Sequence, residues 1–172
     1  MKLGDNLTGL LLVAHPALRD PNFSRTIVFL SQHSEEEGAT GFVLNRPIDS
    51  ELPGEPSVKV YFGGPVDTGQ MLLASLQWRD NPTVVAFRAF VGGEDETSRR
   101  GWEDGMRVFA GCSGWTPGQL EREISENTWL VIPPTRELIE MKDPESAWKN
   151  IMRHSGPLYH LLSEAPDDPS RN

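Results

Sequence analysis

The sequence predicts a single α+β domain with a mixed, mostly antiparallel β-sheet, bent or barrel-like, and helices mainly from the C-terminal half packed on it. Short apolar runs with short connections fill the first half of the chain, as in antiparallel sheets. Helix-start signals are concentrated in the second half. The 172 residues suit one domain with a sizeable core. We expect this domain to span residues 1–163, and the polar residues 164–172 to form a flexible tail.

The first strands are predicted from unbroken apolar runs. Residues 10–14 and 26–31 lack the alternation of a half-buried strand, so we expect both to be covered on both faces. Residues 20–23 have the composition of a turn between them. Residues 35–38 read as a charged hairpin turn, after which residues 41–44 return as a third, antiparallel strand.

The middle of the chain predicts more strands and two loops. Residues 49–57 are rich in proline and glycine and are predicted to form a loop. Apolar and polar residues alternate over 58–62, as in a half-buried strand. Residues 71–76 and 84–90 are further strand candidates, whereas residues 92–104 predict an exposed loop with some local helix.

The second half adds helices to the sheet. Residues 107–111 predict a strand and residues 117–127 a helix with one apolar face. Residues 128–132 return as a strand. Asp143 followed by Pro144 is a helix start, and residues 158–162 predict a final short helix.

The richest pattern lies at residues 111–121, where a strand is predicted to turn sharply into a helix. Thr116 as N-cap, Pro117 at the first helical position and Gln119 three residues after the cap match a capping box. Trp115 and Leu120 occupy the two positions of a hydrophobic staple. The structural motif assigned to this corner comprises Gly114, Trp115, Thr116, Pro117 and Gln119.

Four stretches, in this order, resemble the signatures of the bacterial YqgE/AlgH family: residues 20–26, 41–47, 62–66 and 111–121. The resemblance covers about residues 9–156. The family has no established activity, and the name AlgH reflects a proposed role in regulating transcription for alginate production. Relatives usually have a longer, partly helical connection in place of residues 49–57, and often alanine in place of Cys112.

Composition excludes several function classes. Sixteen basic against 25 acidic residues give a net charge of −9 and a pI near 4.9, which opposes general binding to nucleic acid. One cysteine cannot form an internal disulfide, which favours a reducing cytoplasm. The run at residues 10–14 is too short for a signal peptide or a membrane span. No Cys or His spacing matches a metal site, and no cofactor loop is present, so we expect neither metal nor cofactor.

Cys112 is the sharpest candidate for chemistry. A thiol near a helix N-terminus has a lowered pKa, because the helix dipole stabilises the thiolate. None of the four histidines has a diagnostic spacing to it. The alternative is a small buried residue at a strand end.

A second candidate is an anion site formed by Arg25, Asn45, Arg46 and the backbone of Gly63 and Gly64. In the structural alternative, Asn45 caps a strand end, Arg46 pairs with an acid such as Asp20, and the two glycines allow a turn.

We therefore expect a cytoplasmic regulatory or interaction protein, more consistent with a binding protein than with an enzyme. A protein partner is favoured over direct DNA binding, because the chain is acidic and lacks a basic recognition helix. The alternative function is a small-anion or nucleotide binder, or a thiol-dependent enzyme, that uses the Cys112 corner with Arg25 and Arg46. The sequence predicts no membrane association and does not predict the oligomeric state.

Overall fold

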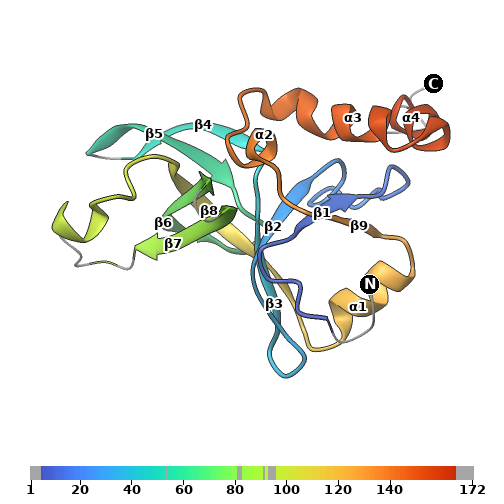
Figure 1. The fold of residues 1–172 in the computed structure, drawn as a ribbon, viewed down its shortest axis with the longest axis horizontal. Coiled ribbons are helices and arrows are strands. Elements are labelled where there is room, and N and C mark those ends of the chain that lie inside the picture. The colour runs from blue at the N-terminus through green and yellow to red at the C-terminus, as the bar shows by residue number, and fades with distance from the viewer. Residues whose placement is uncertain (1–4, 53, 81–82, 91, 93–95, 166–172) are drawn as a thin grey trace.

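The computed structural model describes residues 5–52, 54–80, 83–90, 92 and 96–165. These residues form a single α+β domain in which a mixed sheet curls into a half-barrel and four α-helices pack around it (Figure 1). The predicted fold class is therefore confirmed. The strands of the described chain are β1 (Leu11–Ala14), β2 (Ile27–Ser34), β3 (Gly38–Val43), β4 (Pro47–Leu52), β5 (Glu55–Phe62), β6 (Val66–Asp80), β7 (Thr83–Phe90), β8 (Met106–Trp115) and β9 (Trp129–Ile132).

One strand, β8, joins the two halves of the sheet. The strand order is β4-β5-β8-β3-β2-β1-β9, with β6 paired to β8 and β7 paired to β6. The first part of β8 pairs in parallel with β5 and antiparallel with β6, whereas its last residues pair with β3. The other pairings are antiparallel. The β2–β3 hairpin predicted around residues 35–38 is confirmed.

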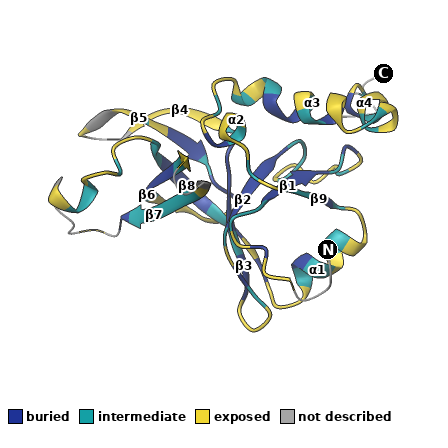
Figure 2. Ribbon diagram, viewed as in Figure 1, coloured by how far each residue is buried: buried dark blue, intermediate teal, exposed yellow. Residues whose placement is uncertain are grey.

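The sheet formed by β1, β2, β3 and β9 is covered on both faces (Figure 2). Leu11 and Val13 of β1 belong to one buried cluster, while Leu12 and Ala14 belong to the other. All four side chains are fully buried. Successive side chains of a strand point to opposite faces. The two cores therefore explain why β1 and β2 are apolar without alternation, as predicted.

The helices lie on opposite faces of this sheet. Leu120 of α1 (Gln119–Ser125) enters the core that contains Trp115 and Trp129, whereas Ile139 and Trp148 enter the other core, which is shared with β6 and β8. Asp143 caps its helix as predicted, accepting a hydrogen bond from the Ser146 N–H at 3.3 Å. The helices are η1 (Glu96–Arg99), α1 (Gln119–Ser125), α2 (Arg136–Ile139), α3 (Pro144–His154) and α4 (Pro157–Ser163).

The loop predicted at residues 49–57 was wrong, because β4 and β5 form a hairpin there. Gly54, with φ +85°, lies at the tip of this hairpin. Gly54 and Pro56 belong to this two-stranded hairpin, whose register is irregular. Low β-propensity therefore led to a loop prediction although the strands pair. Strands β6 and β8 are also longer than predicted, and the short helix α2 was not predicted.

The strand-to-helix turn predicted within residues 111–121 is present, but it starts later than predicted, because β8 continues to Trp115 and α1 begins at Gln119. The N-cap of α1 is Gly118 rather than Thr116, so Pro117 precedes the helix. Gly118 has φ +80°, a left-handed conformation that keeps it and the residues before it out of the helix. Half of the predicted box does form, since the Thr116 N–H donates to Gln119 Oε1 at 3.0 Å.

The predicted tail is described only at its start. Ala165 continues from α4, its N–H donating to the Leu162 carbonyl at 3.2 Å. Residues 166–172 lie outside the described residues, so the flexibility expected of them stays a prediction. In the described part of the chain, no helix has the length and apolar character needed to cross a membrane.

Candidate functional site

Asn45 fastens two of the sequence motifs together through backbone hydrogen bonds. Its Oδ1 accepts from the Ile27 N–H at 2.9 Å, and its Nδ2 donates to the Arg25 carbonyl at 2.9 Å. Asn45 is itself nearly buried, with 9% of its surface exposed. The amide oxygen accepts from one neighbouring backbone group and the amide nitrogen donates to another, so one side chain satisfies both. It thereby fixes the start of β2 against the end of β3.

Arg46 closes the turn that precedes β2. Its Nη1 donates to the carbonyls of Pro21 and Asn22, at 3.1 and 2.6 Å, and its Nη2 donates to that of Ser24 at 2.6 Å. Burial lowers the pKa of Arg46, and the charge of Asp20 opposes that shift. The guanidinium also lies over the Phe62 ring, 5.9 Å from its centroid. These contacts direct the side chain of Arg46 into the turn.

Arg25 extends toward the C-terminal helices. Its Nη2 donates to the Ala165 carbonyl at 2.9 Å, and its guanidinium lies over the Trp148 ring, 5.4 Å from the centroid. Arg25 has φ +60°, a left-handed conformation that is uncommon outside glycine. The side chains of Arg25 and Arg46 thus contact different parts of the chain, although both are anchored around the same turn.

Gly63 and Gly64 lie where their backbone touches β8. A Cβ on Gly63 would approach the Gly111 carbonyl oxygen to 2.3 Å, and a Cβ on Gly64 would approach the Cys112 carbonyl carbon and oxygen to 2.3 Å. The Gly63 N–H donates to the Ala110 carbonyl at 2.9 Å, and its own carbonyl accepts from Ser113 Oγ at 3.0 Å. Only glycine permits this approach. The motif that contains Gly63 and Gly64 and the motif that contains Gly111 therefore meet at the crossing of β8, where this strand passes from one half of the sheet to the other.

Cys112 lies within β8 and not at the N-terminus of α1. Its side chain is partly buried. Burial raises the pKa of the thiol, and the nearby charge of Asp67 raises it further. A raised pKa reduces the fraction of reactive thiolate at neutral pH. The helix dipole invoked for this thiol is absent from its surroundings, and a reactive role for Cys112 stays a prediction.

The five residues of the candidate anion site are therefore brought to one region, but their described polar groups face protein backbone. Binding of an anion by Arg25, Asn45, Arg46, Gly63 and Gly64 stays a prediction. Among the described residues, no group of three or more His, Cys, Asp or Glu side chains is arranged to hold a metal ion.

The chain that carries these motifs is similar to known proteins. A family model described as AlgH-like matches residues 11–160. The chain belongs to the AlgH-like family. The resemblance inferred from the four motifs is thus confirmed.

The relatives match this AlgH-like chain over almost its whole length. UPF0301 proteins of Streptomyces avermitilis and Thermobifida fusca are 36% and 31% identical to it, and each comparison covers 97% of this chain and 96% of the relative. The crystal structure of protein DIP2367 from Corynebacterium diphtheriae has a TM-score of 0.75 and 26% identity, covering 96% of this chain and 95% of that one. The solution structure of AlgH from Pseudomonas aeruginosa has a TM-score of 0.61 and 26% identity, covering 96% and 99%.

Two hollows of the AlgH-like chain lie away from the four sequence motifs. The larger, of about 1040 Å³, lies between α2 and α3 and is lined by residues such as Leu138, Met141 and Ile151. The smaller, of about 370 Å³, contains Arg107 and Tyr61 and lies between β6, β8 and α2. The sequence reasoning missed Arg107. The signal was a lone cation inside an apolar strand sequence, Met106 to Phe109.

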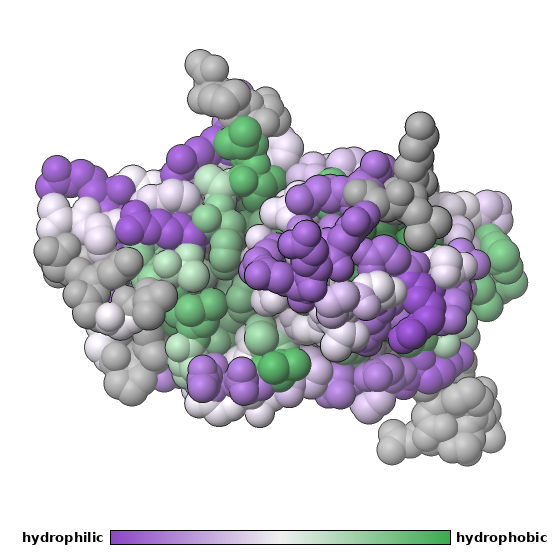
Figure 3. Space-filling view, turned by 90° about the horizontal axis from the view of Figure 1, so that it is seen from below, coloured by the Kyte–Doolittle hydropathy of each residue, from purple (hydrophilic) through white to green (hydrophobic). Residues whose placement is uncertain are grey.

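The surface carries exposed apolar side chains in two settings. Ile48, Val66, Met71 and Val84 belong to the strands, whereas Leu158 and Leu161 belong to α4. Figure 3 shows a band of hydrophobic residues between mainly hydrophilic surfaces, and another hydrophobic patch at the right-hand edge, the side on which α4 lies in Figure 1. The leucines of α4 are the most exposed of these side chains, at 64% and 71%.

Proposed function

We propose that this AlgH-like chain is a cytoplasmic regulatory protein that acts by binding a partner protein through α4. The proposal is carried by the exposure of Leu158 and Leu161. Residues three apart on a helix share a face, so the two leucines form one apolar spot. A polar rim lies beside it, where the Glu164 carboxylate lies 3.7 Å from His160 Nε2 and forms an ion pair with Lys149 Nζ at 4.0 Å. Apolar surface rimmed by polar groups is typical of protein interaction sites.

The partner that suits this surface is a basic protein with an apolar anchor. The net charge of −9 attracts cationic proteins and repels a second copy of the chain. The same charge opposes direct binding to DNA phosphates. The AlgH name reflects a proposed role in regulating transcription. In our proposal the chain exerts such a role through its complex with a partner protein and does not contact DNA directly.

The test of the partner surface is site-specific photo-crosslinking in cells. A photoreactive residue at position 158 is expected to capture one basic protein, and Leu161→Glu is expected to abolish this capture. The matched control is the same photoreactive residue at Ile48, an exposed apolar position on β4. Equal capture from both positions, crosslinking only to a second copy, or no crosslinking would overturn the proposal.

The indirect mode is tested by electrophoretic mobility shift at physiological salt. The purified chain is expected to give no sequence-specific shift with promoter DNA, because few phosphates are neutralised by an acidic protein. A tight, sequence-specific complex formed by the chain alone would contradict this part of the proposal.

A further inference from the structure

The smaller hollow holds a cation without a carboxylate partner. Arg107 Nε donates to the Gly105 carbonyl at 3.2 Å, and Nη2 is 3.4 Å from the carbonyls of Leu76 and Ile139. Within the described residues, Nη1 makes no hydrogen bond and the guanidinium forms no ion pair. The ring of Tyr61 lies below the guanidinium, 5.8 Å from centroid to Cζ.

An arginine in this position is electrostatically expensive for the fold. Burial lowers the pKa of Arg107, because the buried guanidinium loses hydration of its charge, and the electrostatic influence of Tyr61 opposes this shift. Backbone carbonyls at 3.4 Å are weak acceptors for a guanidinium. A bound carboxylate would supply the short, paired hydrogen bonds that the geometry lacks, because guanidinium and carboxylate match in shape and charge.

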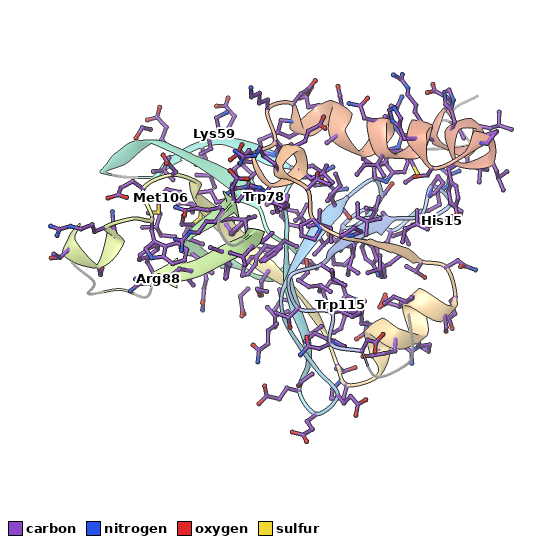
Figure 4. All side chains as sticks on the ribbon, in the orientation of Figure 1. His15, Lys59, Trp78, Arg88, Met106 and Trp115 are labelled. Atoms are coloured by element: carbon purple, nitrogen blue, oxygen red, sulfur yellow. The ribbon has the colours of Figure 1, made fainter. Side chains whose placement is uncertain are left out.

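The rest of the hollow restricts the ligand further. Apolar and aromatic walls come from Tyr61, Trp78 and Met141, and Figure 4 places Trp78 between the β6–β7 strands and α2. Two exposed carboxylates, Asp104 and Glu140, also line the hollow. Glu140 also forms an ion pair with Arg136, Oε1 to Nη1 3.6 Å, so Asp104 carries most of the repulsion of a phosphate or dianion and most of the attraction for an ammonium group. A volume of about 370 Å³ suits a small molecule.

We propose that this hollow binds a free α-amino acid with an apolar side chain. Its carboxylate pairs with Arg107, its ammonium group faces Asp104 and Glu140, and its side chain packs against Trp78. This site is independent of the α4 surface and involves none of the family-motif residues discussed above.

The test uses the full chain and the indole N–H resonance of Trp78, assigned with a Trp78→Phe variant. L-phenylalanine and L-leucine are the probes. At least one is expected to shift this resonance saturably. L-phenylalaninamide and L-leucinamide, which lack the carboxylate, are expected to bind at least about ten-fold more weakly, the loss expected for a charged hydrogen-bonded pair. The N-acetyl derivatives, which lack the ammonium charge, are expected to bind several-fold more weakly.

Variants separate binding from folding. Arg107→Met is expected to abolish saturable binding, and the exposed substitutions Asp104→Asn and Glu140→Gln to weaken it. Arg122→Met, at an exposed position of α1, is the control and should bind normally. The proposal is overturned if neither amino acid shifts the resonance, if the amides bind as well as the acids, or if inorganic phosphate binds more tightly than either probe. The analogue series uses the unmodified chain, so it decides the question even if Arg107→Met does not fold.

Discussion

At the residue scale, two glutamates of α1, Glu121 and Glu123, have side-chain pKa values shifted in opposite directions by their surroundings. Glu121 Oε1 lies 2.5 Å from His33 Nε2, a buried ring whose Nδ1 accepts from the Leu7 N–H at 3.0 Å. The Leu7 bond leaves the ring proton on Nε2, so the neutral histidine donates to the carboxylate. Glu123 instead has a buried Oε2 that makes no hydrogen bond among the described residues, and the buried Trp129 Nε1 likewise has no partner there.

We expect Glu121→Gln to lower the free energy of unfolding by about 1 kcal/mol near neutral pH, because a charged acceptor is replaced by a neutral one. Burial, the largest single influence, acts to raise the pKa of Glu121, but the hydrogen bond from His33, a backbone hydrogen bond and the further electrostatic influence of His33 together outweigh it, so the net pKa is lowered. A carboxylate with a lowered folded pKa stabilises the fold above its unfolded pKa, and this contribution is lost as the pH falls through the folded pKa. The difference between the variant and the parent should therefore shrink in acid.

Urea unfolding at neutral and acidic pH measures this difference. Glu126→Gln, at an exposed position just after α1, is the control and should show no such pH dependence. A Glu121→Gln effect of the same size at every pH would show that the carboxylate charge is not involved.

We expect the opposite sign for Glu123→Gln, a gain of about 1 kcal/mol near neutral pH. Burial raises the pKa of Glu123, against the influence of the indole N–H groups of Trp115 and Trp129. A carboxyl whose pKa is raised in the folded state contributes stability only while it is protonated, so this contribution to the free energy of unfolding is lost as the pH rises through the folded pKa. The gain from Glu123→Gln should therefore disappear on acidification in the same unfolding experiment. Destabilisation at neutral pH would mean that the indole groups outweigh burial.

At the element scale, the crossing of β8 depends on glycines with no room for a side chain. Gly111 has φ +75°, and a Cβ there would lie 2.5 Å from the Gly64 carbonyl oxygen. Gly64 has φ +152° and meets β8 equally closely. The backbone at Gly64 and the backbone at Gly111 thus restrict each other. This close approach lets the single strand β8 pair with β5 in one half of the sheet and with β3 in the other.

We expect Gly64→Ala to lower the free energy of unfolding by at least about 2 kcal/mol, because backbone rather than a flexible side chain must move. Chemical denaturation measures the effect. Gly69→Ala, also in this part of the chain, is the matched control, since no atom lies within 4 Å of the added Cβ. We expect that control to change stability by less than about 0.5 kcal/mol. Equal effects of the two substitutions would remove the crossing as the explanation.

At the scale of the whole molecule, the two cores share the strands β1, β2 and β3. Trp148 reports on one core and Trp115 and Trp129 on the other. Because alternate residues of the same strands enter both cores, neither core can lose its packing while the other keeps it. The domain should therefore unfold as one cooperative unit.

We expect coincident urea transitions from far-UV circular dichroism and from tryptophan fluorescence. A triple variant, Trp78→Phe with Trp102→Phe and Trp148→Phe, leaves only Trp115 and Trp129, which report on the other core. Its fluorescence transition should still coincide with its circular dichroism. Separate midpoints for the two probes would show that the cores unfold independently.

Elements whose conformation depends on residues close together in the sequence were predicted correctly, and elements that depend on distant pairing partners were not. Strands β1 and β2, the hairpin after β2 and the start of α3 rest on apolar runs, turn residues and a cap within a few positions of one another. The β4–β5 hairpin and the far end of β8 were predicted wrongly, because their pairing partners, not their own residues, determine their conformation.

The sequence by itself determined the family, the α+β class and the two-faced burial of the first strands, because motif order and hydrophobic pattern are local properties. Only the tertiary structure decided what the candidate residues contact. Asn45 and Arg46 meet the turn before β2, Glu121 meets His33, and Arg107 meets carbonyls from β6 and α2. The physical reason is that these partners are far apart in the chain, so their distances, burial and charge balance exist only once the two halves of the sheet have closed around β8.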